Sequence, residues 1–152
     1  MRTPIPTWTF ALVVVRRGHQ FLLVHERKHG QRWYLPAGRV EPGELLADGA
    51  RRETLEESGV PVRLDGILRI EHTPQPDQSC RVRVFFLASP IDDTSPITAP
   101  NAHALEAGWF SLDELRRLPL RGPEVEQVCA HVEAGGPVYP MVLLQTEGTR
   151  WS

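Results

Sequence analysis

The apolar residues in the first part of the chain fall into short runs that predict β-strands. Residues 8–15 and 20–25 are rich in β-branched and aromatic side chains, and Gly18 separates the two runs. Two such runs joined by a short polar link are typical of a β-hairpin. Similar runs further along the chain predict strands at residues 33–35, 64–72, 81–88 and 109–110.

Two longer segments have the composition of helices. Residues 45–58 carry Ala, Leu, Arg and Glu, and Gly59 follows them at a position where helices commonly end. Gly49 lies inside this segment, where glycine costs about 1 kcal/mol relative to alanine. A second helix is predicted over residues 123–134, with proline in its first turn. Ser111 begins a sequence that is typical of a capped helix start.

The segments between these elements are predicted loops. Residues 38–43 contain two glycines and a proline, which indicates a loop of defined shape. Residues 89–101 form a long loop rich in Pro, Ser, Thr and Asp, and loops of this length often have a functional role. Residues 138–144 are expected to form a last strand or a docked tail. Without repeats or linkers, the pattern predicts one mixed α/β domain over residues 1–152.

Composition and charge narrow the classes of partner. A net charge of −2 over 152 residues does not indicate a basic surface for binding polymeric nucleic acid. No apolar run approaches the ~20 residues that span a bilayer, and residues 1–6 lack the apolar core of a signal peptide. We therefore expect a cytoplasmic protein without a membrane partner, as a monomer or homodimer. Cys80 and Cys129 are expected to be reduced thiols.

Three glutamates on the first predicted helix are candidates for metal binding. At 100° per residue, Glu53, Glu56 and Glu57 lie within about a 100° arc of one helical face. Like charges at this spacing repel each other, so this row of glutamates needs a nearby cation to compensate its charge. Arg52 can pair with Glu56, and a divalent metal such as Mg²⁺ can be shared among carboxylates. From this spacing alone, a solvated acidic face is the slightly favoured interpretation.

A longer motif around these glutamates resembles the signature of the Nudix (MutT-like) hydrolases. Gly38 is followed after five residues by Glu44 and after seven more by Arg-Glu-x-x-Glu-Glu-x-Gly-aliphatic, which ends at Val60. Only Thr54 stands where the signature often has an aliphatic residue. The resemblance implies the Nudix α/β/α sandwich with a mixed sheet. It also implies hydrolysis of a diphosphate bond in a small nucleoside di- or triphosphate-like substrate, with Mg²⁺ or, as a substitute, Mn²⁺.

The resemblance also implies roles for individual residues. Glu53, Glu56 and Glu57 would hold the metal ions together with the carbonyl of Gly38. Arg52 would orient the glutamates, and Glu44 would support the loop or a metal-bound water. In such a site the metal neutralises the diphosphate and lowers the pKa of a bound water, which attacks phosphorus.

The chain departs from the family pattern at one position. Related members often carry a glutamate six residues before the strand tryptophan, here Trp109, where it serves as an extra metal ligand or base. His103 stands at that position, and Glu106 is the nearest acid. An imidazole can accept a proton from water near neutral pH. The general base is therefore Glu53, His103 or Glu106, and the sequence leaves this choice open.

Four further residues are candidates for substrate binding. Trp33 can stack on a base, with packing in the core as the alternative. Arg27 and Arg39 flank the expected cleft and can bind phosphate, with a solvent-facing position as the alternative. Arg81 belongs to the basic face of its predicted strand, where arginines alternate with valines.

Substrate identity rests on softer resemblances. Residues 33–39 look like the corresponding loop of Nudix members that act on oxidised guanine nucleoside diphosphates. Residues 120–140 look like bacterial Nudix phosphatases of hydroxymethylpyrimidine pyrophosphate and of nucleoside di- and triphosphates. Thiamin pyrophosphate and ADP-ribose are further alternatives. A non-catalytic Nudix domain that binds a regulatory ligand is the alternative from another class, but such domains typically lose the glutamates that this chain keeps.

Overall fold

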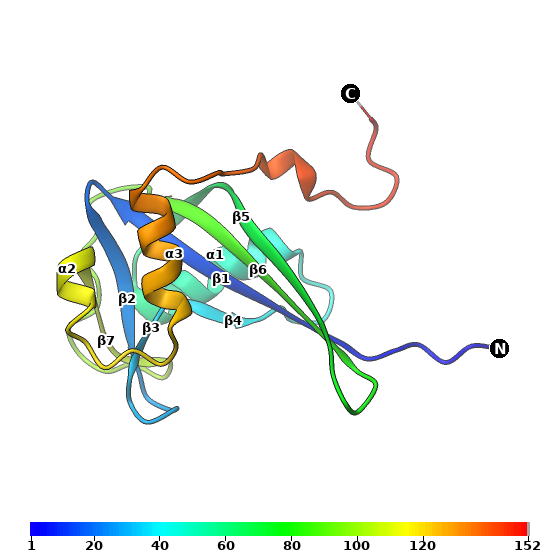
Figure 1. Cartoon of the computed structure of the whole chain (residues 1–152), viewed down its shortest axis with the longest axis horizontal. Coiled ribbons are helices and arrows are strands. Elements are labelled where there is room, and N and C mark those ends of the chain that lie inside the picture. The colour runs from blue at the N-terminus through cyan, green and yellow to red at the C-terminus, as the bar shows by residue number, and fades with distance from the viewer. Residues whose placement is uncertain (152) are drawn as a thin grey trace.

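The computed structural model describes residues 1–151 as a mixed β-sheet with helices on both faces (Figure 1). The strands are β1 (Thr7–Arg17), β2 (Gln20–Glu26), β3 (Trp33–Tyr34), β4 (Ala37–Arg39), β5 (Val62–Pro74), β6 (Cys80–Pro90) and β7 (Ala104–Ser111). The helices are α1 (Leu46–Ser58), α2 (Leu112–Leu115) and α3 (Glu124–Glu133), followed by the 3₁₀ turn η1 (Met141–Leu143). None of the helices in residues 1–151 is long and apolar enough to cross a membrane.

The sheet is mixed, and β1 changes its pairing partner along its length. The main path runs β3-β2-β1-β6-β5, with β4 paired to β1 and β7 paired to β2. Strands β1 and β6 are parallel, and the other pairs are antiparallel. The predicted hairpin is present, but β1 pairs with β2 only near the turn, at Arg16 and Arg17. Nearer its start, β1 pairs with β4 instead, from Phe10 to Leu12.

Alternation along β1 produces a core on each side of the sheet. Ala11, Val13 and Val15 belong to the core that contains Ala50 of α1. Leu12 and Val14 belong to the other core, which contains Leu115 of α2 and Val125, Cys129 and Val132 of α3. Figure 1 accordingly shows α3 in front of the sheet and α1 behind it. The predicted α/β/α sandwich with a mixed sheet is therefore confirmed.

Several local predictions are confirmed by backbone and side-chain geometry. Gly59 ends α1 with a φ of 76°, a left-handed conformation that favours glycine. Ser111 and Glu114 form a reciprocal capping box at the start of α2. Thr54 is fully buried, and its hydroxyl donates to the carbonyl of Ala50, which makes a polar residue acceptable there. Cys80 and Cys129 are both free thiols.

Two boundaries differ from the sequence prediction because pairing overrides local pattern. Residues 37–39 form strand β4 on the edge of β1, so the predicted loop at 38–43 begins only at Val40. Strand β7 spans Ala104–Ser111 and not only residues 109–110, because it pairs along the buried strand β2. The C-terminal segment 138–144 docks through one bridge between Ile67 and Tyr139 and then forms η1.

Candidate functional site

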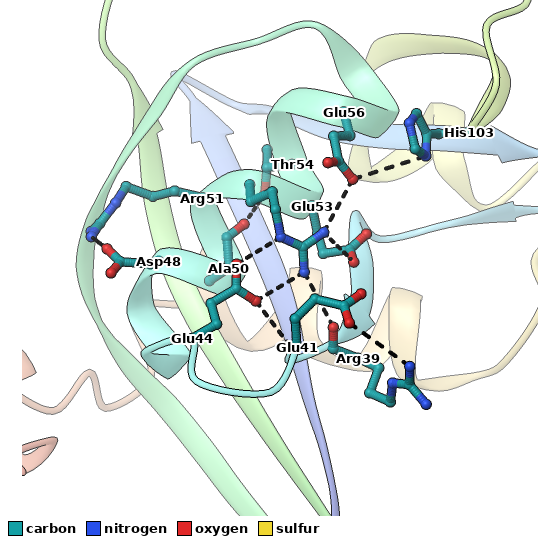
Figure 2. Close-up of polar contacts among 11 residues, drawn as sticks. Arg39, Glu41, Glu44, Asp48, Ala50, Arg51, Glu53, Thr54, Glu56 and His103 are labelled. Atoms are coloured by element: carbon teal, nitrogen blue, oxygen red, sulfur yellow. Dashed lines mark hydrogen bonds and ion pairs between the residues drawn. The ribbon is translucent and has the colours of Figure 1, made fainter.

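Arg52 lies at the centre of a polar cluster on α1 (Figure 2). It donates to both oxygens of Glu44, from Nε at 2.7 Å and from Nη2 at 3.0 Å. Its Nη1 donates to Glu53 Oε1 at 2.9 Å and to Glu56 Oε2 at 3.1 Å. Its Nη2 also donates to the carbonyl of Arg39 at 3.3 Å. The predicted pairing of Arg52 with Glu56 is thus present, within a wider network that joins α1 to the preceding loop.

Glu44 connects this network to the loop backbone. Its Oε1 also accepts from the N–H of Glu41 at 3.0 Å. The hydrogen bond from Arg52, followed by that from Glu41, lowers the pKa of Glu44 to about 2. Glu44 is therefore a carboxylate at neutral pH, and its contacts agree with a role in holding the loop.

The same carboxylate explains the glycine inside α1. A Cβ on Gly49 would lie 2.9 Å from Glu44 Oε1 and 3.4 Å from Val40 Cγ2. Alanine in place of glycine ordinarily raises the stability of a helix by ~1 kcal/mol. We expect Gly49→Ala not to raise the free energy of unfolding, because the Glu44 side chain would have to move. In a Glu44→Ala background the same change should stabilise the protein by about that amount. Urea unfolding of the four proteins measures this coupling, and equal effects of Gly49→Ala in both backgrounds would contradict it.

Gly38 leaves room for the carboxyl group of Glu53. A Cβ on Gly38 would lie only 2.1 Å from Glu53 Cδ, so any larger residue would displace that carboxyl group. The side chain of Glu53 is 15% exposed. Burial raises its pKa, and the neighbouring Arg52 opposes this shift. The absence of a side chain at Gly38 therefore places a desolvated carboxyl group directly against the backbone of β4.

Glu57 is the second desolvated carboxyl group of the helix. Its Oε1 accepts from the backbone N–H of Ala37 at 2.8 Å. Burial, with a smaller contribution from nearby Glu53, raises the pKa of Glu57 to about 8. A carboxylate in this position needs a compensating positive charge to remain ionised at neutral pH.

These donors fit a divalent cation that prefers carboxylate oxygens. Arg52 donates a hydrogen bond to one oxygen of Glu53 and to one oxygen of Glu56, and the N–H of Ala37 donates to one oxygen of Glu57. Each carboxyl group keeps a second oxygen that makes no hydrogen bond within residues 1–151. In that part of the chain, however, no three acidic, histidine or cysteine side chains converge as a preformed metal site. The guanidinium of Arg52 occupies the space between two of the three carboxyl groups.

The raised pKa of Glu57 predicts how stability depends on pH without metal. A folded-state pKa of about 8 lies above the ordinary value of 4.5, so this group stabilises the fold below about pH 4.5. That contribution is lost as pH rises toward 8. We expect the Tm of the protein in chelator to fall from pH 5 to pH 9, and Glu57→Gln to reduce this fall. Thermal melts of both proteins over this range measure the difference, and parallel curves would contradict the assignment.

A cavity of about 400 Å³ opens beside Glu57 and Gly38. Phe10 and Leu12 of β1 and Tyr34 of β3 contribute apolar surface to its lining. The cavity is also lined by the cationic side chains of Arg27, Lys28, Arg81, Arg83 and Arg121 and by the imidazoles of His29 and His103. The cavity therefore has an acidic part at α1 and a basic part that receives residues from β6, from the loop after β2 and from the loop before α3.

Five of the predicted site residues line this cavity, three form the polar cluster of Arg52, Glu53 and Glu56 beside it, and three lie elsewhere. Glu57, Gly38, His103, Arg27 and Arg81 line it. Trp33 is instead packed in the core, 8% exposed, stacked on His25 and edge-on to Phe110. This position agrees with the alternative expected for Trp33, packing in the core, and not with stacking on a substrate base.

Arg39 and Glu106 also lie away from the cavity. The side chain of Arg39 packs over the ring of Trp8 and lies 3.8 Å from Glu41 Oε2, because its position on β4 directs it outward. Only its carbonyl takes part in the Arg52 cluster. Glu106 is paired with His25 across β7 and β2, with 3.9 Å between its Oε2 and His25 Nδ1. Neither Arg39 nor Glu106 is among the residues that line the cavity, and for Arg39 this agrees with the solvent-facing alternative.

Sequence reasoning missed four residues of the cavity wall. Arg83 donates from Nε to Glu71 Oε1 at 2.7 Å, and it shares the basic face of its strand with Arg81. Tyr34 donates its hydroxyl to Glu124 Oε1 at 2.5 Å. Arg121 and Glu26, which are 95 positions apart in the chain, form an ion pair at 3.0 Å. Alternation on the strand could have identified Arg83, but only the fold brings the others together.

Comparison with known proteins places this arrangement in a family. Residues 6–130 match the NUDIX domain. The Escherichia coli protein named "Phosphatase NudJ" is 31% identical, over 91% of this chain and 90% of its own. The chain belongs to the Nudix family. A NUDIX hydrolase structure from Nitrosomonas europaea superimposes with a TM-score of 0.77 at 28% identity, covering 95% of this chain and 99% of its own.

A second relative is much longer than this Nudix chain. The human protein named "8-oxo-dGDP phosphatase NUDT18" is 34% identical over 70% of this chain. The match covers only 32% of the human protein, so the chain spans about a third of that relative's length. The mouse protein of the same name is 30% identical, and 41% of it is covered.

His103 occupies the position at which this Nudix chain departs from the family pattern. The loop after β6 is held to α1 because Asn101 Nδ2 donates to the carbonyl of Glu56 at 3.0 Å. Asn101 Oδ1 accepts from the backbone N–H of His103 at 2.7 Å, which fixes the turn. His103 Nδ1 then lies 3.9 Å from Glu56 Oε2, with the side chain 47% exposed. The loop therefore brings the imidazole to the edge of the acidic cluster.

We expect His103→Ala to lower kcat/KM by less than about tenfold, or ~1.4 kcal/mol. The imidazole is half exposed and lies beyond hydrogen-bonding distance of Glu56, so its effect on the carboxylate is screened. The pH profile of kcat/KM should keep its acid limb in the variant. Disappearance of that limb would instead identify His103 as the general base.

Proposed function

We propose that this Nudix domain hydrolyses a diphosphate bond in a small nucleoside di- or triphosphate-like substrate with Mg²⁺. The observation that carries the proposal is the juxtaposition of Glu57 with a basic cavity wall. A desolvated carboxyl group that needs a cation opens onto a space lined by five lysine and arginine side chains. A substrate diphosphate bound together with a divalent cation would compensate both sets of charges.

In this proposal each part of the site has one task. Glu53, Glu56 and Glu57, with the Gly38 carbonyl, would hold the metal. When bound, Mg²⁺ would neutralise the diphosphate and lower the pKa of a water that attacks phosphorus. Arg52 keeps the glutamates in position through its hydrogen bonds. The cations of the cavity wall bind the phosphate groups and reduce the repulsion that an anionic nucleophile would meet.

Among candidate substrates, oxidised guanine nucleoside diphosphates come first. The name of the human relative supports this choice, and a cavity of about 400 Å³ is within the usual size for nucleotide-like ligands. Hydroxymethylpyrimidine pyrophosphate, thiamin pyrophosphate and ADP-ribose are the alternatives to be compared. We also propose a cytoplasmic location, in line with the two free thiols.

A substrate panel tests the proposal. The protein is incubated with each candidate in Mg²⁺, in Mn²⁺ and in chelator, and the products are identified by mass. In ¹⁸O-labelled water, the label should appear in the product whose phosphorus was attacked. Glu57→Gln, prepared in parallel, should lack the activity and so exclude a contaminating hydrolase. Nucleotide binding without hydrolysis of any candidate would indicate a non-catalytic ligand-binding domain instead.

A further inference from the structure

Asn101 joins helix α1 to the turn that precedes strand β7. Its side-chain Nδ2 donates to the carbonyl of Glu56 at 3.0 Å. Its Oδ1 accepts from the backbone N–H groups of His103 at 2.7 Å and of Ala104 at 2.8 Å. Its own N–H donates to the Ala104 carbonyl at 2.9 Å. One side chain therefore closes the turn and also attaches it to the helix.

The contact with Glu56 satisfies a carbonyl that the helix itself leaves free. The last C=O groups of an α-helix have no partner within the helix, and α1 ends at Ser58. Ile97, in the same loop as Asn101, donates its N–H to the Ser58 carbonyl at 2.9 Å. These two hydrogen bonds attach the loop after β6 to the turn of α1 that carries Glu56 and Glu57.

The backbone carbonyl of Asn101 holds the guanidinium of Arg27. Arg27 Nη1 donates to this oxygen at 3.0 Å, although the two residues are 74 positions apart. Arg27 lines the cavity, and it has no carboxylate partner within residues 1–151. By contrast, Arg83 and Arg121 of the cavity wall are each paired with a glutamate. The uncompensated charge of Arg27 and its remaining N–H donors are therefore available to an anion.

We propose that Asn101 is a positioning residue, which fixes the distance between Arg27 as a phosphate ligand and Glu57 as a metal ligand. Its side chain is attached to the last turn of α1, and its carbonyl is attached to Arg27. Without the attachment to the helix, the loop and the guanidinium would be free to move relative to Glu57. The inference rests on the proposed function, because it takes one diphosphate to contact both the metal and Arg27.

Asn101→Ser removes the attachment to the helix and leaves the carbonyl that holds Arg27. The serine hydroxyl can still accept from the N–H groups of the turn, but it is too short to reach the Glu56 carbonyl. Asp92→Ser is the matched control in the same loop. Asp92 Oδ1 accepts from the N–H of Thr94 at 2.9 Å, and no hydrogen bond within residues 1–151 joins Asp92 to α1.

The measurement is calorimetric binding of methylenediphosphonate in Mg²⁺, because this diphosphate analogue has a bridge that resists hydrolysis. Arg27→Gln should weaken binding by about tenfold, since a charged hydrogen bond is lost. Asn101→Ser should weaken binding by about fivefold when Arg27 is present, and by less than about twofold in the Arg27→Gln background. Asp92→Ser should change binding by less than about twofold in both backgrounds. Thermal melts check that each variant is folded.

An equal loss from Asn101→Ser in both backgrounds would overturn the proposal, because the effect would then not pass through Arg27. An unchanged affinity in Asn101→Ser, or no binding of methylenediphosphonate by wild type, would overturn it as well. If Asn101→Ser does not fold, Asn101→Asp replaces it, because the carboxylate keeps the acceptor of the turn and loses the donor to Glu56. Hydrolysis of a panel substrate together with additive effects refutes only this inference, whereas the absence of hydrolysis refutes the proposed function.

Discussion

Glu57→Gln should lower kcat by about a thousandfold, or ~4 kcal/mol in activation free energy, while the protein stays folded. The amide oxygen can still accept from the Ala37 N–H. The neutral amide also avoids the cost of burying a charge, which is what raises the pKa of Glu57 to about 8. What is lost is the negative charge that we propose to hold the metal. Glu56→Gln should have a similar effect on kcat. Steady-state kinetics at saturating Mg²⁺, with thermal melts on the same samples, measure both quantities.

Asp48 on the same helix provides a control, because it distinguishes the effect of losing the Glu57 charge from the effect of losing any negative charge on α1. Asp48 lies in the first turn, and its carboxylate contacts Arg51 at 2.6 Å on the outer side of the helix (Figure 2). Asp48→Asn removes one negative charge without touching the cavity, and kcat should stay within twofold of wild type. The metal assignment fails if Glu56→Gln and Glu57→Gln both retain near wild-type turnover.

Arg52→Ala should reduce both stability and apparent affinity for Mg²⁺. The variant loses hydrogen bonds to three carboxylates, and losing charged hydrogen bonds in a partly buried network costs roughly 2–3 kcal/mol. At this chain length that corresponds to a decrease in Tm of about 5–10 °C. The released Glu53 and Glu56 must be ordered again when metal binds, at about 1.5–2 kcal/mol each. Loss of the guanidinium charge acts in the opposite direction and favours metal binding, but solvent screens this effect because the group is partly exposed.

We expect the loss of positioning to outweigh the loss of repulsion, and the Mg²⁺ concentration for half-maximal activity to rise by about tenfold. Metal titrations of activity and metal-dependent melts measure this shift. Arg52→Lys is the conservative comparison, and we expect it to recover little, because an ammonium cannot make the forked contact with Glu44. A rise in KM alone, with Tm and metal dependence unchanged, would instead assign Arg52 to the substrate.

The sequence predicted the acidic part of the site better than the basic part, for a physical reason. Glu53, Glu56 and Glu57 share a single helix, so the helical period alone places them together. Trp33 and Tyr34 are neighbours on a strand, where side chains alternate and the sequence does not say which one faces the cavity. The structure gives that position to Tyr34, since Trp33 packs against His25 and Phe110.

The remaining wall residues depend on contacts between distant segments. Glu26 and Arg121 come from β2 and from the loop before α3, and no local pattern relates them. Arg39 was assigned to the cleft from its place in the motif, but its pairing on β4 with Phe10 directs it toward Trp8. The strand register, which the sequence leaves open, thus decides which of the many arginines can reach a substrate.

The single bridge between Ile67 and Tyr139 has a consequence for solubility. Strand β5 forms one end of the main strand path, so its outer backbone groups are available to pair with another chain. Tyr139 donates to and accepts from Ile67, both at 2.8 Å, on that outer edge. The preceding Val138 approaches so closely that a Cβ on Gly66 would lie 2.5 Å from its Cγ1. The tail lies beyond the matched family region 6–130 and covers the β5 edge at Ile67, so its removal should open this part of the edge to intermolecular β-pairing.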